Sequence, residues 1–145
     1  MPRHLKILLV EDCPDDVSLI ECELTKAGFV FTSMVVSEED KFRRSLSMFM
    51  PDVVLVDDSP GRFSAIEAFR LFQAHSITHQ VTIPFILVTD GASTEFATHF
   101  LKLGVDDHVW IFALRALPAA IEGALRRCKV KARCPAYRVV NEGKL

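Results

Sequence analysis

Acidic side chains stand at the ends of three apolar segments of this chain, and together they could bind a divalent cation. Glu11 and Asp12 follow the first segment, Asp57 follows the third, and Asp90 follows the fourth. Neighbouring carboxylates repel one another, and a hard cation such as Mg²⁺ offsets that repulsion. Mg²⁺ uses few carboxylates, keeps several waters and also takes phosphate oxygens, so an open acidic cluster suits it. A single acid at such a position is ordinarily a solvated loop residue, and the prediction therefore depends on convergence.

The segments that must position these acids alternate with stretches of helical period. Strands are expected over residues 5–10, 29–36, 52–57, 83–89 and 105–112. Helices are expected between Pro14 and Gly28, from an N-cap at Ser37 to Pro51, over residues 65–72, between Phe96 and Gly104, and over residues 114–127. The alternation predicts five β-α repeats in one domain.

Two of the expected strands predict how the sheet is built. Residues 7–10 and 53–56 are apolar at successive positions, which is typical of strands that helices cover on both faces. We therefore expect an α/β fold with a doubly wound, five-stranded parallel sheet in the order 2-1-3-4-5. In that order the first and third strands are neighbours, so Glu11, Asp12 and Asp57 converge at the carboxyl end of the sheet.

Composition excludes several function classes. The 145 residues are 50% hydrophobic and 25% charged, which excludes a disordered chain. A formal net charge of −2 gives no overall attraction to nucleic acid or to anionic lipid. The apolar runs are far shorter than the roughly 20 residues of a membrane span, and the first residues lack the apolar core of a signal peptide. Four cysteines without a C-x-x-C spacing indicate reduced thiols, so we expect a cytoplasmic protein.

The last residues differ from the rest. Residues 129–145 break the β-α alternation and carry five basic side chains against one acid, Glu142. We therefore expect a domain over residues 1–128 and a solvated basic tail over residues 129–145. The tail lacks the motifs of a nucleic-acid-binding segment, so nucleic acid is not an expected partner.

Four segments, in this order, resemble a known family. They are residues 5–12 (LKILLVED), 51–57 (PDVVLVD), 83–89 (IPFILVT) and 104–109 (GVDDHV). Over about residues 5–127 the sequence resembles the receiver domain of bacterial two-component response regulators. The resemblance implies a flavodoxin-like, three-layer α/β/α fold and a stand-alone signalling protein that is not an enzyme in its own right.

The resemblance also implies a site and a mechanism. Asp57 would accept a phosphoryl group from a histidine kinase or phosphotransfer protein and become an aspartyl phosphate. Mg²⁺ would be held by Glu11, Asp12, Asp57 and the backbone carbonyl of Ser59. Thr89 would be the switch hydroxyl that hydrogen-bonds the phosphoryl group. The resulting shift would change the face formed by the fourth helix, fifth strand and fifth helix, where a downstream protein or a second copy of the chain binds.

Three positions depart from the family pattern. Ile111 stands where the family has a lysine that contacts the phosphoryl group, three residues after an aromatic position that is His108 here. Pro60 follows Asp57 by three residues instead of four, so that loop is one residue short. Asp90 replaces the small residue that follows the switch hydroxyl. These changes make the site more negative, which favours Mg²⁺ but disfavours an incoming phosphoryl dianion.

Several interpretations stay open at this stage. The leading one is a receiver with altered phosphorylation, in which Arg62 is either a substitute cation or a solvated loop residue. The alternative is a pseudo-receiver, an interaction module that works without phosphorylation. A phosphohydrolase is disfavoured because Ser59 occupies the place of its second acid. A flavin-binding domain is disfavoured because Glu11 and Asp12 would repel a phosphate after the first strand.

Two pairs of side chains that do not belong to the acidic cluster each have two possible roles. His75 and His79 are spaced i, i+4 and could ligate a metal on a helix, but no third ligand is evident. Trp110 and Phe112 on the fifth strand are either covered strand residues or part of an apolar docking surface, for example of a homodimer.

Overall fold

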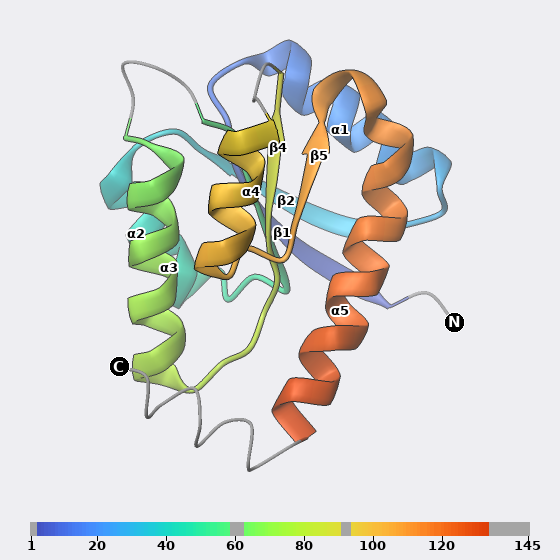
Figure 1. Cartoon of the computed structure of the whole chain (residues 1–145). Helices are drawn as coiled ribbons and strands as arrows, with labels where there is room; N and C mark the ends of the chain where they lie inside the picture. Colours follow the sequence, from blue (N-terminus) through green and yellow to red (C-terminus); the bar gives the residue numbers. More distant parts are fainter. Residues whose placement is uncertain (1–2, 59–62, 91–93, 134–145) are drawn as a thin grey trace.

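Five parallel strands form one sheet in the order β2-β1-β3-β4-β5 (Figure 1). The strands are β1 (His4–Val10), β2 (Val30–Val36), β3 (Val53–Val56), β4 (Phe85–Thr89) and β5 (Asp107–Trp110). The structure is a computed structural model, and it describes residues 3–58, 63–90 and 94–133. The predicted α/β fold, its doubly wound parallel sheet and its 2-1-3-4-5 order are confirmed.

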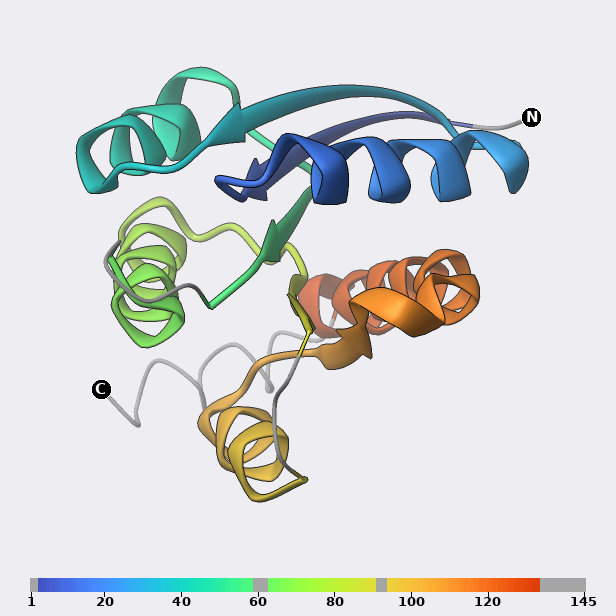
Figure 2. The same ribbon diagram turned by 90° about the horizontal axis from the view of Figure 1, so that it is seen from above.

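Helices cover both faces of the sheet. They are α1 (Pro14–Lys26), α2 (Glu39–Met48), α3 (Ala65–His79), α4 (Thr94–Leu103) and α5 (Leu117–Arg133), and a 3₁₀ helix, η1 (Ile111–Ala116), precedes α5. Seen from above, α1 and α5 lie on one face, and α2, α3 and α4 lie on the other (Figure 2). Among the described residues, no helix combines the length and the apolar character needed to cross a lipid bilayer.

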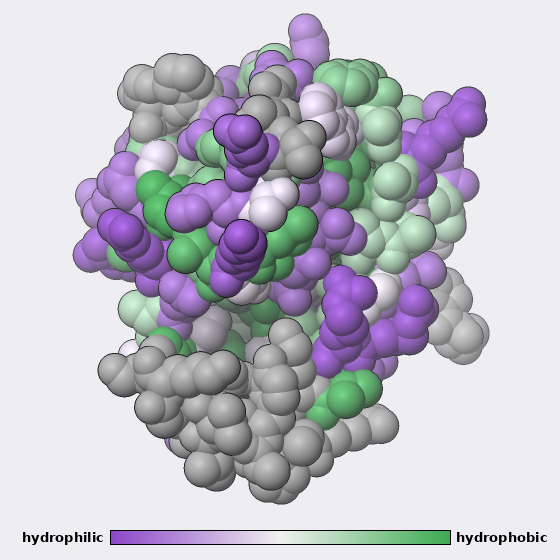
Figure 3. Space-filling view, in the orientation of Figure 1, coloured by the Kyte–Doolittle hydropathy of each residue, from purple (hydrophilic) through white to green (hydrophobic). Residues whose placement is uncertain are grey.

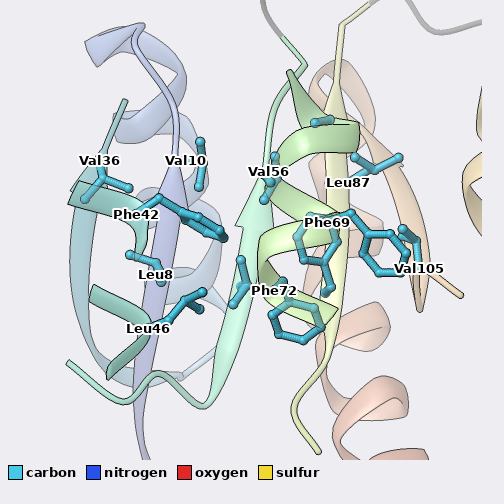
Figure 4. Packing of buried hydrophobic residues seen from close by; sticks show 14 of the residues in the cluster. Leu8, Val10, Val36, Phe42, Leu46, Val56, Phe69, Phe72, Leu87 and Val105 are labelled. Carbon is cyan, nitrogen blue, oxygen red and sulfur yellow. The ribbon is translucent and has the colours of Figure 1, made fainter. Parts of the chain in front are cut away.

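Each face of the sheet has its own apolar core. On the α2–α3–α4 side, Phe42 and Phe69 pack with Leu8 and Val10 of β1 and with their neighbours (Figure 4). On the α1–α5 side, Ile7 and Leu9 of the same strand pack against helix residues. Alternate residues of β1 thus enter opposite cores, which explains why the strand is apolar at successive positions.

The boundaries of several elements differ from the prediction. The fifth strand was expected to reach residue 112, but β5 ends at Trp110, where it pairs with Thr89, the last residue of β4. Beyond Trp110 the partner strand has ended, and the chain turns into η1. The N-cap of α2 is Glu38 and not Ser37, with Glu39 and Asp40 in its first turn, where acids are favoured.

The end of the chain is helical for longer than expected. The α5 helix begins three residues later than predicted and continues to Arg133, so its last turn includes the first residues of the predicted basic tail. Residues 134–145, which contain most of that tail, lie outside the described residues.

Candidate functional site

Three carboxyl groups meet at the carboxyl end of the sheet. One oxygen each of Glu11, Asp12 and Asp57 can be chosen so that all three atoms lie within 4.8 Å of one another. Glu11 is buried, Asp57 is half-buried and Asp12 is exposed, so the cluster opens toward solvent. The predicted convergence of these residues is therefore present in the structure. An all-oxygen set of this size and openness fits Mg²⁺, whose remaining coordination positions are ordinarily filled by water or phosphate oxygens.

The register of two neighbouring strands brings these carboxyl groups together. β1 and β3 pair in parallel with Val10 opposite Val56, and the next residues of the two strands are Glu11 and Asp57. Backbone hydrogen bonds continue past the strands: the Asp57 N–H donates to the Val10 carbonyl, and the Glu11 N–H donates to the Val36 carbonyl. The ladder thus fixes both backbones up to the acidic residues themselves.

The protonation of Glu11 is strongly affected by its surroundings. Burial, and after it the nearby Asp57 carboxylate, raises the pKa of Glu11 to about 7 from an ordinary value of 4.5. Two backbone hydrogen bonds oppose the shift, because the N–H groups of Asp12 and Cys13 donate to Glu11 Oε1 at 3.1 and 3.2 Å. A cation bound at this cluster would favour the ionised form of Glu11.

Asp58, the acid that follows Asp57 after the end of β3, has a different role. The N–H of Ala65, the first residue of α3, donates to Asp58 Oδ1 at 3.0 Å. Ser64 forms a capping box with Glu67 at the same helix end. Asp58 therefore stabilises the start of α3 and is not part of the cluster, although nothing in its local sequence distinguishes it from Asp57.

Other residues of the predicted site follow β3 in the sequence. Ser59, whose backbone carbonyl is the expected fourth metal ligand, lies outside the described residues. The same holds for Pro60 and for Arg62, the suggested substitute cation. Their roles remain predictions.

Thr89, the predicted switch hydroxyl, is the last residue of β4 and is only 4% exposed. Val56 pairs with Leu87, so Thr89 lies on the strand next to Asp57, at the same end of the sheet. Its Oγ1 forms a hydrogen bond with Nε2 of His108 on β5, at 2.7 Å. The sequence prediction missed this bond, although the order 2-1-3-4-5 already makes β4 and β5 neighbours.

The two remaining departures from the family pattern have different surroundings. Ile111, in the place of the lysine, is partly buried and packs on the α1–α5 side core. Asp90 follows Thr89 directly and is exposed. Isoleucine offers no donor and no charge, so its side chain contributes packing and no contact for a phosphoryl group.

The side-chain pairs with open roles are placed as follows. The rings of His75 and His79 are 4.3 Å apart at the end of α3, and no group of three or more metal-ligating residues among the described residues includes them. Trp110 is half-buried, its ring centroid is 5.1 Å from that of Phe112, and Phe112 is 71% exposed. Phe112 is therefore not a covered strand residue.

Comparisons with known proteins agree on the fold. No protein-family model matches the sequence, and no curated protein matches it. Similar solved structures include the signal receiver domain of a Luxo repressor protein from Vibrio parahaemolyticus, with TM-score 0.73 and 15% identity over 89% of this chain and 95% of that chain. Another is the signal receiver domain of a modulated diguanylate cyclase from Desulfovibrio desulfuricans, with TM-score 0.72 and 19% identity over 89% of this chain and 99% of that chain.

A third similar structure is the phosphorylated cyanobacterial phytochrome response regulator RcpA, with TM-score 0.66 and 17% identity over 83% of this chain and 95% of that chain. Identities this low concern the fold and not the chemistry of the site. The sheet order, the helical layers and these neighbours together establish that the chain has the fold of a response-regulator receiver domain.

Proposed function

We propose that the chain is a receiver that accepts a phosphoryl group on Asp57. The observation that carries this proposal is the convergence of Glu11, Asp12 and Asp57 within 4.8 Å at the carboxyl end of the sheet. In an open α/β sheet this end is the place where ligands bind. RcpA, one of the structures of similar fold, is a phosphorylated response regulator.

The proposed reaction is a phosphoryl transfer to a carboxylate. An Asp57 oxygen attacks phosphorus, the bond from phosphorus to a kinase histidine nitrogen breaks, and that nitrogen keeps the electron pair. Glu11, Asp12 and Asp57 would hold Mg²⁺, with the Ser59 carbonyl as an expected further ligand. When bound, the ion would neutralise charge on the transferred group.

The expected consequences lie in protein contacts. The donor would be a histidine kinase or phosphotransfer protein in the cytoplasm, and the output would be a downstream protein or a second copy of this chain. The exposed ring of Phe112, next to Trp110, supports an output surface that includes β5 and η1. The chain would act as a signalling protein and not as an enzyme.

The experiment is intact-mass measurement after incubation with Mg²⁺ and acetyl phosphate. The wild-type chain should gain one phosphoryl group, and the Asp57→Asn variant should gain none. Asp58→Asn is the matched control. Asp58 caps α3, so this variant should still form the adduct. Absence of the adduct in a folded wild-type chain, both with acetyl phosphate and with a panel of phosphorylated histidine kinases, would reject the proposal.

A second candidate function is a pseudo-receiver, which binds a partner without being phosphorylated. It is favoured by Ile111, which packs into the α1–α5 side core where the family pattern has a lysine. This candidate predicts that Asp57→Asn leaves partner binding unchanged. The leading proposal predicts that the same variant abolishes any dependence of partner binding on a phosphodonor.

A further inference from the structure

The hydroxyl group of Thr89 already has a partner in this structure. Its Oγ1 is 2.7 Å from Nε2 of His108, and Thr89 is buried while His108 is half-buried. On β5 the neighbouring residue Val109 packs into the α1–α5 side core, so His108 faces the opposite side of the sheet. Thr89 follows Val88 with the same alternation and reaches the same side. The bond thus joins two side chains that the sheet holds in one place.

A threonine hydroxyl carries one proton and can donate it to one acceptor at a time. When His108 Nε2 carries no proton, it can accept the hydroxyl proton of Thr89. When Nε2 carries a proton, the imidazole donates to Oγ1, and the hydroxyl proton is left for another acceptor. The proton on one ring nitrogen therefore decides in which direction Thr89 donates.

We propose that His108 is a positioning residue for Asp57 phosphorylation, because the proton on its Nε2 decides whether Thr89 can donate to the phosphoryl group. This inference rests on the proposed function, which gives the phosphoryl oxygen as the second acceptor. In the resting state Nε2 accepts from Thr89, and the proton of the neutral ring lies on Nδ1. Gain of a second proton by the ring reverses the bond and makes the Thr89 proton available.

The surroundings of His108 keep its imidazole ring neutral near pH 7 in the resting state. Burial lowers the pKa of His108 from 6.5, and the carboxylate of Asp107 partly opposes this. β4 carries no charged residue, and Asp90, which follows it, is exposed. The titratable side chains of α4 are exposed, and they are Glu95, His99 and Lys102. On the other side of the sheet the charged residues of η1 and α5 with described side chains are also exposed; they are Arg115, Glu122, Arg126, Arg127 and Lys129.

The inner face of α4 is apolar, and its charged side chains lie on the exposed face. On the side of the molecule where α4 lies, hydrophobic surface is interspersed with hydrophilic surface (Figure 3). Leu101 and Leu103 of α4 are partly exposed. The helix turns Ala97 and Phe100 inward toward the sheet. Apolar side chains thus separate the charged residues of α4 from β4 and β5.

The first test is the rate of phosphorylation of the full chain by acetyl phosphate with Mg²⁺, from pH 5.5 to 8. As the pH rises, the ratio of the wild-type rate to the His108→Phe rate should fall by about tenfold or more. The reason is that Thr89 in the wild-type chain no longer donates a hydrogen bond to the charged phosphoryl group. In a Thr89→Val background, His108→Phe should have no further effect. His99→Phe, on the exposed face of α4, should keep the wild-type profile.

The second test needs no phosphorylation. The imidazole ¹⁵N shifts of His108 at pH 7.5 should show a proton on Nδ1 in the wild-type chain. In Thr89→Val they should show the Nε2–H form that free histidine prefers. A wild-type ring that carries its proton on Nε2 would overturn the proposal, as would parallel rate profiles of wild type and His108→Phe.

The outcomes separate this inference from the proposed function. If the wild-type chain forms the adduct but its profile matches that of His108→Phe, only the role of His108 is rejected. If no adduct forms with any donor, the proposed function is rejected, and the role of His108 in phosphorylation is rejected with it, whatever the ¹⁵N shifts show. Thermal unfolding of each variant confirms that it is folded before its rate is compared.

Discussion

The carboxyl groups of Glu11 and Asp57 follow directly on the paired residues Val10 and Val56 of two adjacent strands. Because the ladder between these two parallel strands ends at paired residues, the acids that come next lie side by side. Glu11 is 3% exposed, and this burial together with the neighbouring Asp57 raises its pKa to about 7. The juxtaposition has consequences for stability, for metal binding and for phosphorylation.

Without divalent cations, stability should decrease with pH because of Glu11. The folded state holds the Glu11 proton up to about pH 7, whereas the ordinary value is 4.5. The stabilising contribution is therefore fully present below pH 4.5 and is lost as the pH rises through 7, up to about 3 kcal/mol. In urea unfolding from pH 4.5 to 8.5, Glu11→Gln should gain stability relative to the wild-type chain as the pH rises. Parallel stability curves for the two proteins would contradict this.

Mg²⁺ binding should depend on the three clustered acids and not on their neighbours. Asp12→Asn removes one ligand charge and should weaken Mg²⁺ binding by about tenfold or more. Asp15→Asn is the matched control, because Asp15 is an exposed acid in the first turn of α1 outside the cluster. Isothermal titration calorimetry measures both affinities. Equal losses in the two variants would indicate a general charge effect instead of a site.

Introducing a cation at position 111 should speed phosphorylation. Ile111→Lys supplies a charge-assisted donor, worth about 1.5–3 kcal/mol at a phosphoryl group, or about 10–150-fold in rate with acetyl phosphate. Ile111→Met is the matched control, since it is also unbranched but carries no charge. Ile111 packs on the α1–α5 side core, so Ile111→Lys should also lower stability by about 1 kcal/mol. Equal rates for the Lys and Met variants would show that the absence of a cation at position 111 does not limit the reaction.

The core of the α2–α3–α4 side should be sensitive to truncation, in contrast to an exposed ring of the same type. Phe42 is a fully buried residue of α2, and Phe42→Ala should lower the free energy of unfolding by about 3–5 kcal/mol. Phe112 is 71% exposed, and Phe112→Ala should change the free energy of unfolding by less than about 0.5 kcal/mol. Urea unfolding measures both. A large loss for Phe112→Ala would show that this ring is covered, for example in a dimer.

The sequence by itself determined the fold and the acidic cluster. Apolar residues at successive positions of β1 and β3 require cover on both faces, and that requirement leads to a parallel sheet with crossover helices. Once the strand order is known, acids that directly follow the first and third strands must be neighbours. Such patterns depend on local periodicity and on a small set of allowed topologies, so they can be recognised without coordinates.

Only the tertiary structure decided what individual polar groups do. Asp58 bonds the first N–H group of α3, while the adjacent Asp57 joins the cluster, and this difference arises only where the chain passes from β3 toward α3. The end of β5 at Trp110 depends on where its partner strand ends. The bond between Thr89 and His108 depends on the register of β4 and β5 to within one residue. Register, burial and hydrogen-bond partners are properties of the packed sheet, and for this reason no local sequence pattern could specify them.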